Sequence, residues 1–359
     1  MSYKAIHTLQ ELQIRQALPL CAKIQMTKLR VRDWVNEFGV DGVYISFSGG
    51  KDSTVLLHIC RELYPNMRAM FVDTGLEYPE IRSFVRSFDN VDIIRPEMNF
   101  KQVIEKYGYP IISKEVSKDV YYSKTKIGGS HWRKLHGEKK NDNGEKSIFN
   151  NDRYIFLESA PFSVSSRCCD IMKKKPAHKY GKETGRVPIT AQMAAESLLR
   201  QTNWLRHGCN AFDSKYPISN PLSFWRENDI LQYIKENNIE ICSVYGEIVP
   251  DYQDEQFSGQ MDFCDFGLVE DNRKLKTTGC DRTGCMFCLY GSQREKAGEG
   301  RFERMKKTHP KQYDFIMRPK EKGGLNYKEV IDWTNEHGGL NIRYKKRRRN
   351  PPFFLQKKF

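Results

Sequence analysis

Short apolar runs alternate with segments of helical periodicity over the first hundred residues of this chain. Apolar runs at residues 43–47, 69–74 and 91–96 predict buried strands. Between them, residues 54–64 and 79–88 carry apolar side chains at helical spacing, which predicts two amphipathic helices. Strand, helix, strand, helix, strand is typical of an open parallel sheet, so we expect an α/β protein with a doubly wound parallel sheet.

The hydrophobic pattern also divides the rest of the chain. Helical spacing over residues 10–38 predicts a helical segment ahead of the first strand. The α/β pattern resumes at 185–190 and 216–225, and residues 227–239 predict a further amphipathic helix. We therefore expect an N-terminal helical segment (1–40), an α/β domain (41–250) and a C-terminal region with clustered cysteines and a basic tail (251–359).

Basic residues gather in two segments. Residues 123–153 are rich in Lys, Gly and Asn and predict a mobile insertion in the α/β domain. Residues 343–359 carry eight Lys and Arg and no acidic residue, and the whole chain has a formal net charge of +14. We expect a nucleic acid, held by its phosphates, as a partner of both segments. The alternative is a generally basic soluble protein.

Targeting signals are not evident in the sequence. No apolar run approaches the roughly 20 residues that span a bilayer, and the charged N-terminus lacks the apolar core of a signal peptide. We expect a cytoplasmic protein with no membrane partner. In that compartment, ten cysteines do not predict a disulfide framework.

The first strand is followed by the polar string "SGGKDS", residues 48–53. A strand, a Gly-containing loop and a helix place backbone N–H groups where an anion binds. Gly49 and Gly50 let the backbone approach a phosphate, Lys51 supplies charge, and Ser48 and Ser53 offer hydroxyls. The loop lacks the Gly-x4-Gly-Lys-Ser/Thr pattern of ordinary kinases and GTPases. The alternative is a plain strand–helix turn.

This string resembles the pyrophosphate-binding loop of the adenine nucleotide α-hydrolase (PP-loop) superfamily, and "FVDTGLEYPE" (71–80) resembles the phosphoadenosine phosphosulfate (PAPS) reductase branch. The resemblance implies a loop that holds the pyrophosphate of ATP, with Mg²⁺, during attack at the α-phosphorus. It implies catalytic roles for Lys51, Asp52 and Asp73. The nucleotide-binding residues that it implies are Ser48, Gly49, Gly50, Lys51, Asp52, Ser53, Asp73, Thr74, Gly75, Glu77 and Arg200.

Two further segments extend the resemblance to about residues 25–290. "AAESLLR" (194–200) is similar to the branch's Gly-Ile-Arg-x-x-Glu-Ser-x-x-Arg element and matches it at Glu196, Ser197 and Arg200. Ala191 and Met193 replace its glycine and first arginine, which argues against the usual sulfate-carrying nucleotide. "PLSFWRENDILQYI" (221–234) is similar to the segment that follows.

Five cysteines are clustered: Cys168 with Cys169, and Cys280 with Cys285 and Cys288. The adjacent pair and the Cys-x2-Cys supply four thiolates, enough for one [4Fe–4S] cluster or one structural Zn²⁺. Soft thiolates suit both, and reduced thiols without a metal are a third alternative. Cys280 is a competing ligand that would leave one of the adjacent pair unused.

A resemblance favours the [4Fe–4S] cluster over Zn²⁺ and over reduced thiols. Cys-Cys-x3-Lys-x2-Pro with a later Cys-x2-Cys resembles the [4Fe–4S] pattern of adenylylsulfate (APS) reductases, and Lys173 and Pro176 match it. We expect Arg282 to offset the negative charge of the cluster. The ligands that the resemblance implies are Cys168, Cys169, Cys285 and Cys288.

The expected reaction follows from what the sequence lacks. Reductases of this family use a cysteine in a C-terminal Glu-Cys-Gly-Leu-His segment, and this chain has no cysteine after Cys288. We therefore expect an ATP pyrophosphatase that adenylates an acceptor for sulfur transfer. Its general layout resembles tRNA thiolases and the ATP pyrophosphatase of DNA phosphorothioation, and this resemblance implies a cysteine desulfurase as sulfur donor.

Two other functions stay open. One is a sulfonucleotide (PAPS or APS) reductase of sulfur assimilation that uses a thiol elsewhere. The other is a nucleotide-sensing, nucleic-acid-binding module in which the metal site is structural.

Overall fold

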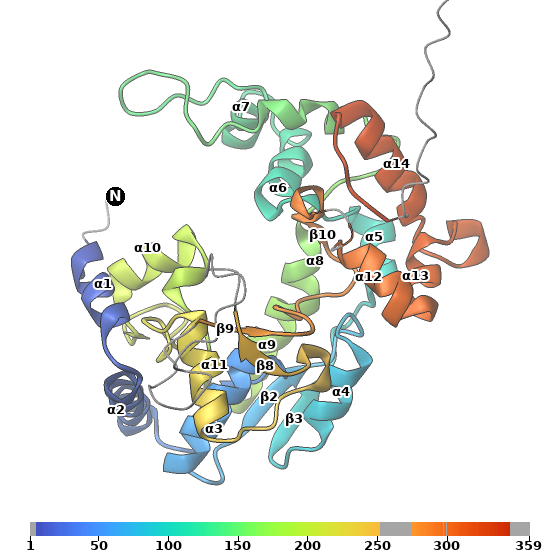
Figure 1. The fold of residues 1–359 in the computed structure, drawn as a ribbon. Coiled ribbons are helices and arrows are strands. Elements are labelled where there is room, and N and C mark those ends of the chain that lie inside the picture. The colour runs from blue at the N-terminus through green and yellow to red at the C-terminus, as the bar shows by residue number, and fades with distance from the viewer. Residues whose placement is uncertain (1–4, 252–273, 297, 299, 345–359) are drawn as a thin grey trace, which may run out of the picture. The chain divides into compact units, whose positions relative to one another are not determined.

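The computed structural model describes residues 5–251, 274–296, 298 and 300–344. The chain forms two compact units, each assembled from segments that are far apart in the sequence (Figure 1). Unit 1 consists of Met1–Asp73, Glu77–Arg95 and Pro176–Gly284, and unit 2 of Thr74–Leu76, Pro96–Lys175 and Cys285–Phe359.

A six-stranded sheet in the order β3-β2-β1-β5-β7-β6 forms the centre of unit 1. Neighbouring strands are parallel except at the edge, where β6 runs antiparallel to β7. Ile45 of β1 lies beside Ala69 of β2 and Ile189 of β5, so β1 is the strand at which the chain order reverses. The strands are β1 (Val43–Ser46), β2 (Ala69–Val72), β3 (Val91–Ile94), β5 (Val187–Ile189), β6 (Asn210–Ala211) and β7 (Ile218–Ser219).

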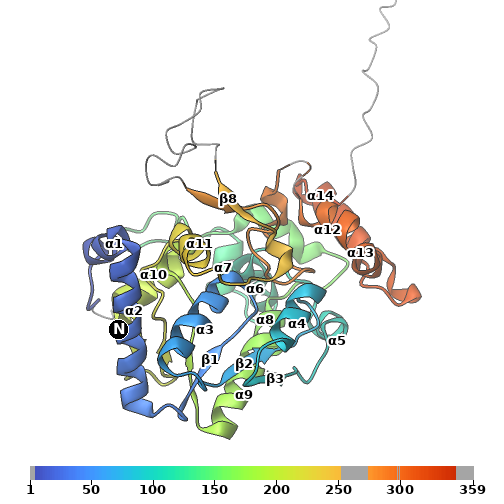
Figure 2. The same cartoon turned by 60° about the horizontal axis from the view of Figure 1, so that its bottom comes forward.

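Helices pack on both faces of this sheet (Figure 2). Tyr44 and Met70 form a buried cluster with Tyr180 of α9. On the opposite face, the Phe47 ring lies 5.2 Å from that of Phe88, just after α4. The helices of unit 1 are α1 (Leu9–Ala17), α2 (Leu20–Phe38), α3 (Lys51–Leu63), α4 (Pro79–Arg86), α9 (Lys175–Thr184), α10 (Leu198–His207) and α11 (Glu227–Glu236).

A short antiparallel pair, β8 (Ile248–Pro250) and β9 (Leu275–Thr277), also belongs to unit 1. The chain after β9 turns back along residues 244–246, because the Cys280 N–H donates to the Val244 carbonyl at 3.0 Å. This turn brings residues 281–283 close to the loop after β1.

Unit 2 is mainly helical and contains one parallel strand pair, β4 (Ile111–Ile112) with β10 (Leu289–Tyr290). Its core includes Tyr109, whose hydroxyl donates to the Leu325 carbonyl at 2.9 Å. Its helices are α5 (Phe100–Tyr107), α6 (Lys114–Ser123), α7 (Ser130–Leu135), α8 (Arg167–Cys169), α12 (Arg301–Thr308), α13 (Pro310–Met317) and α14 (Tyr327–Gly338), with a π-helix at Asp170–Lys174.

The α/β class and the doubly wound, mostly parallel sheet predicted from the sequence are confirmed. The N-terminal helical segment is two helices, because Pro19 forces Leu18 into an extended conformation and ends α1. Residues 123–153, predicted to be a mobile insertion, contain α7. Most of the predicted basic tail lies outside the described residues. Within the described residues, no helix is both long and apolar enough for a membrane span.

Candidate active site

The loop after β1, residues 48–53, needs a glycine at position 49. Gly49 has φ +70°, and a Cβ there would lie 2.7 Å from Val85 and 2.9 Å from Ile81. Both the left-handed backbone and this close packing exclude larger residues. Gly49 therefore lets the chain turn sharply from β1 into α3.

Two serine hydroxyls hold the loop in shape. Ser48 Oγ and Ser53 Oγ lie 3.0 Å apart, and Ser53 Oγ donates to the Gly50 carbonyl at 2.9 Å. Gly50 is the N-cap of α3, and no described side chain caps it. The positive end of α3 therefore faces the loop, and in its first turn the Lys51 N–H donates to the Tyr245 hydroxyl.

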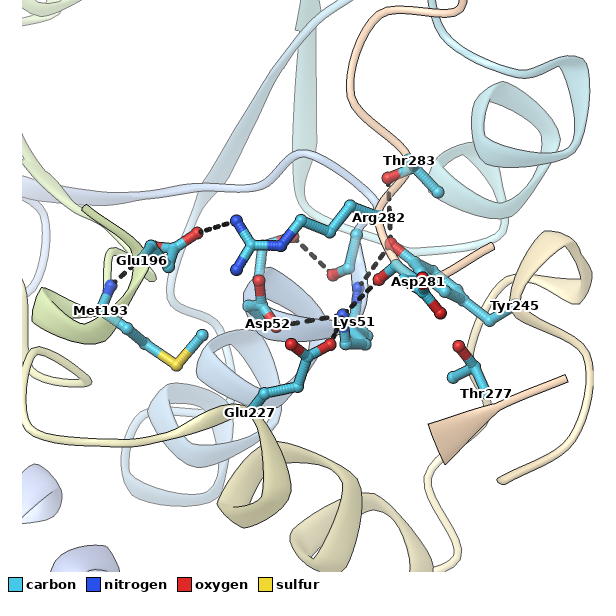
Figure 3. Close-up of polar contacts among 12 residues, drawn as sticks. Lys51, Asp52, Met193, Glu196, Glu227, Tyr245, Thr277, Asp281, Arg282 and Thr283 are labelled. Atoms are coloured by element: carbon cyan, nitrogen blue, oxygen red, sulfur yellow. Dashed lines mark hydrogen bonds and ion pairs between the residues drawn. The ribbon is translucent and has the colours of Figure 1, made fainter. Parts of the chain in front are cut away.

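Lys51 lies at the centre of the polar contacts in Figure 3 and is only 2% exposed. Its Nζ donates to the Asp281 carbonyl at 2.6 Å and pairs with Glu227 at 3.0 Å. Its backbone N–H donates to the Tyr245 hydroxyl at 3.1 Å, and that hydroxyl lies 2.9 Å from Thr283 Oγ1. The Nζ and the backbone N–H of Lys51, which could bind an anion, thus both donate to oxygens of the protein.

Glu227 is positioned by the anchoring of α11. Asp229, in the same helical turn, accepts a hydrogen bond from buried Lys23 at 2.7 Å. Trp225 donates its indole N–H to Thr27 Oγ1 at 2.9 Å. These contacts attach the N-terminus of α11 to α2 and so place Glu227 beside Lys51.

Asp52 is a half-buried carboxylate, and one of its two oxygens is buried without a hydrogen bond from a described residue. Its Oδ1 lies 4.0 Å from Lys51 Nζ and accepts no hydrogen bond from any described residue. Burial raises the pKa of Asp52, and the charges of Lys51, Arg282 and Arg200 oppose that rise. A cation near Oδ1 would satisfy this oxygen.

Two arginines meet on one carboxylate beside Asp52. Glu196 forms ion pairs with Arg200 and, at 3.1 Å, with Arg282. It also accepts the Met193 N–H at 2.9 Å, which fixes its orientation. Burial lowers the pKa of Arg200, as does the charge of Arg282. Together with Lys51, the two arginines concentrate positive charge at the carboxyl edge of the sheet.

Asp73, predicted to be near the nucleotide, ends β2 with its carboxylate surrounded by arginines. Arg82 pairs with it at 2.9 Å, Arg86 at 3.6 Å and Arg95 at 3.7 Å. Glu77 is buried in the same unit. The other two residues predicted for this turn, Thr74 and Gly75, belong to unit 2, where Thr74 Oγ1 accepts the Leu76 N–H at 3.1 Å.

Four of the clustered cysteines lie in unit 2 and shift one another's pKa values. Cys168 and Cys169 end α8 with their sulfurs 3.9 Å apart. The hydrogen bond between them raises the pKa of Cys168 and lowers that of Cys169, to about 6. Burial raises the pKa of Cys288 to about 11, and Cys285 and Cys169 add to this rise. Cys168, Cys169, Cys285 and Cys288 are called the four-cysteine group below.

The four-cysteine group is the predicted site of a [4Fe–4S] cluster or of one Zn²⁺. Among the described residues, no three or more His, Cys, Asp or Glu side chains are placed to hold a metal ion. Four sulfurs around one Zn²⁺ would lie about 3.8 Å apart, since each Zn–S bond is ~2.3 Å. The sulfurs of Cys168 and Cys169, 3.9 Å apart, have about this spacing. The type and number of the donors fit either Zn²⁺ or a [4Fe–4S] cluster.

Cys280, the competing ligand, belongs to unit 1, where its buried thiol is 3.7 Å from the Tyr78 hydroxyl. Arg282, expected beside the cysteines, also lies in unit 1 and pairs with Glu196. In unit 2 it is Arg301 that contacts the cysteine segment, donating to the Cys288 carbonyl at 2.7 Å.

The sequence did not reveal several residues that surround Lys51. Tyr245 and Thr283 stand in segments without a recognisable motif, and Asp281 acts through its backbone carbonyl. Glu227 had one signal, its place at the start of a predicted helix, but an acidic residue there is common for capping reasons alone.

Known proteins resemble this chain over most of its length. A family model of the phosphoadenosine phosphosulfate reductase domain matches residues 42–115 and 100–290. An uncharacterised protein of Methanocaldococcus jannaschii is 33% identical over 69 residues, which are 18% of this chain and only 17% of that relative's length.

Among solved structures, the PAPS reductase of Candida auris, as a phosphate complex, is 17% identical, with a TM-score of 0.36 over 67% of this chain and 92% of that one. The NH3-dependent NAD synthetase of Campylobacter jejuni, with nitrate, is 11% identical, with a TM-score of 0.32 over 62% and 76%. The family match spans residues 42–290, well over half of the 359 residues. The chain therefore belongs to the phosphoadenosine phosphosulfate reductase domain family.

Proposed function

We propose that this protein is an ATP pyrophosphatase that adenylates an acceptor, so that sulfur can then replace the acceptor's oxygen. The observation that carries the proposal is the loop after β1. There Lys51 and a half-buried, incompletely paired Asp52 face the Arg200–Glu196–Arg282 group. This arrangement suits a polyanion that gains charge as it leaves.

In the proposed step, an oxygen of the acceptor attacks the α-phosphorus of ATP. The bond from that phosphorus to the bridging oxygen breaks, and pyrophosphate leaves with the electron pair. Lys51 exchanges the Asp281 carbonyl and Glu227 for phosphate oxygens, and its N–H exchanges the Tyr245 hydroxyl. The N-terminus of α3 and the two arginines stabilise the departing charge.

Asp52 would hold the Mg²⁺ that accompanies ATP. Its Oδ1 is buried without a hydrogen bond from a described residue, and Mg²⁺ prefers carboxylate oxygens with phosphates as further ligands. Binding of a cation would favour the ionised form of this carboxyl group, which burial alone disfavours.

The four-cysteine group would hold a [4Fe–4S] cluster, with Zn²⁺ as the alternative metal. Such a cluster would bind or deliver the sulfide that replaces oxygen. Lys114 and Lys173 favour the thiolate of Cys169, although burial opposes it, and a thiolate is the form that binds metal. Arg301 holds the backbone at Cys288.

A nucleic acid is the proposed acceptor, and a cysteine desulfurase the proposed sulfur donor. The charge of +14 supports a polyanionic partner. Exposed Lys124, Lys126, Arg133 and Lys140 in the insertion offer phosphate contacts without sequence readout.

Pyrophosphate release tests the proposal. Anaerobically purified protein is incubated with ATP, Mg²⁺, sulfide and total tRNA or DNA. Release that depends on the nucleic acid is expected. ATP binding without release would instead indicate a nucleotide-sensing module.

The second candidate is a sulfonucleotide reductase, which membership of the PAPS reductase domain family favours. Sulfite release from PAPS or APS with an added dithiol reductant would establish it and exclude the pyrophosphatase.

A further inference from the structure

A cavity of about 230 Å³ lies in unit 1 at the carboxyl ends of β5 and β7. Gln192 and Met193 reach it from the segment after β5, and Asn220 from the residue after β7. Asn203 and Trp204 of α10 close it from the other side. Every lining residue belongs to unit 1.

The sheet order separates this cavity from the loop that suits the nucleotide. The order reverses at β1, with β2 and β3 on one side and β5 and β7 on the other. The loop proposed to bind phosphate, residues 48–53 and called the phosphate loop below, follows β1, and Asp73 follows β2. In open α/β sheets, ligands bind outside the carboxyl ends where the order reverses. The cavity is therefore placed for a second reactant on the far side of β1.

One ion-paired group joins the cavity to the phosphate loop. Arg200 lines the cavity, and its charge acts on the carboxyl group of Asp52. Glu196 pairs with Arg200 and Arg282 and accepts the N–H of Met193, another lining residue. A molecule in the cavity would thus lie against the same residues that face the loop.

The size of the cavity limits what it can hold. Its volume is below the roughly 300–1,000 Å³ typical of drug-sized ligands. It suits one ring system rather than a whole nucleotide. Trp204 provides an apolar wall and is only 2% exposed. Its other contacts, stacking on His7 and Arg15 above the ring, hold the indole in place.

The lining chemistry selects a neutral, polar ring. The lining has two side chains that can carry positive charge, Arg200 and His207, and Arg200 is paired with Glu196. The side-chain amides of Gln192 and Asn203 supply both donors and acceptors, and Asn220, whose Oδ1 accepts from the Thr190 hydroxyl, supplies its N–H groups. Such amides pair with the edges of nucleobases, whereas a carboxylate or phosphate would need a cation.

We propose that this cavity receives an unpaired nucleobase of the acceptor. The role of the bound base rests on the proposed function, because the base would carry the oxygen that is adenylated. Binding of the base does not rest on that function and can be measured without turnover.

Binding of free nucleosides tests the inference. Uridine, cytidine, adenosine and guanosine are titrated into the full chain and followed by saturation-transfer NMR. At least one is expected to bind. Gln192→Ala and Asn203→Ala are each expected to weaken it by roughly 3- to 10-fold, the effect of one net hydrogen bond. Asn66→Ala, in a different cavity of unit 1, is the matched control and should leave the affinity unchanged.

Several results would overturn the inference. These are no binding of any of the four nucleosides, equal affinity in the Asn203→Ala variant, or displacement of the nucleoside by a free amino acid at similar concentration. The two proposals fail separately. Nucleoside binding without pyrophosphate release leaves the cavity assigned and removes the pyrophosphatase. Nucleic-acid-dependent pyrophosphate release with no nucleoside binding would support the pyrophosphatase and overturn the assignment of the cavity.

Discussion

The phosphate loop of unit 1 and the four-cysteine group of unit 2 handle buried charge differently. Around the loop, buried acids face cations: Asp73 meets Arg82, and Glu196 meets Arg200. In the four-cysteine group, burial raises the pKa of Cys288, which keeps the thiol protonated. These acids have cationic partners before any ligand arrives. The cysteines gain most from a metal, which would displace their protons.

The largest expected effect is a loss of visible absorbance with no change in ATP binding. The Cys285→Ser/Cys288→Ser double variant should lose all broad absorbance near ~400 nm after anaerobic purification, because two of four ligands are gone. ATP binding, measured by calorimetry, should not change. Cys21→Ser, at an exposed cysteine outside the group, is the control. Equal absorbance in the double variant would place the cluster on other residues.

Lys51→Met should remove the main charge of the loop. Pyrophosphate release is expected to fall roughly 10²–10³-fold, as for the loss of a group that stabilises developing charge. The visible spectrum should stay the same, since the four-cysteine group is in unit 2. Lys182→Met, on the exposed side of α9, is the matched control. An unchanged rate would remove Lys51 from the reaction.

Gly49→Ala should destabilise unit 1 by about 1–3 kcal/mol, because a Cβ meets Val85 at 2.7 Å and φ is +70°. Urea unfolding measures the change. Gly185→Ala separates the two causes: its φ is +72°, but nothing lies within 4 Å of the added Cβ. It should show only the backbone effect, about 1 kcal/mol. Equal losses at both positions would mean that the contact with Val85 is unimportant.

The smallest expected effect concerns Asp52. Its pKa is raised by burial in the folded state, so its ionisation destabilises the fold. In EDTA without nucleotide, Asp52→Asn should raise Tm above that of the unaltered protein at neutral pH. The gap should shrink as pH falls through the raised folded-state pKa of Asp52 and close only below about pH 3, where the carboxyl group is protonated in both states. A lower Tm for the variant at pH 7 would contradict this reading of the site.

Much of the fold could be predicted because its signals are local. The strands at 43–47, 69–74 and 91–96 correspond to β1, β2 and β3, since a short apolar run between helices has few alternatives. The predicted helix at 54–64 begins earlier, at Lys51, with Gly50 as its N-cap. Residues 51–53 are polar, so a prediction from the spacing of apolar residues does not include them. The division into units could not be predicted, because it depends on contacts between distant segments.

The sequence by itself determined the strand–loop–helix around "SGGKDS" and the four cysteines as a set, because those signals are spacing and residue type. Only the tertiary structure decided what surrounds Lys51. Tyr245, Glu227 and the Asp281 carbonyl reach it from segments about two hundred residues away along the chain. It also decided that Cys280 and Arg282 lie in unit 1. Contacts over such separations follow from how the chain packs, and no local pattern records them.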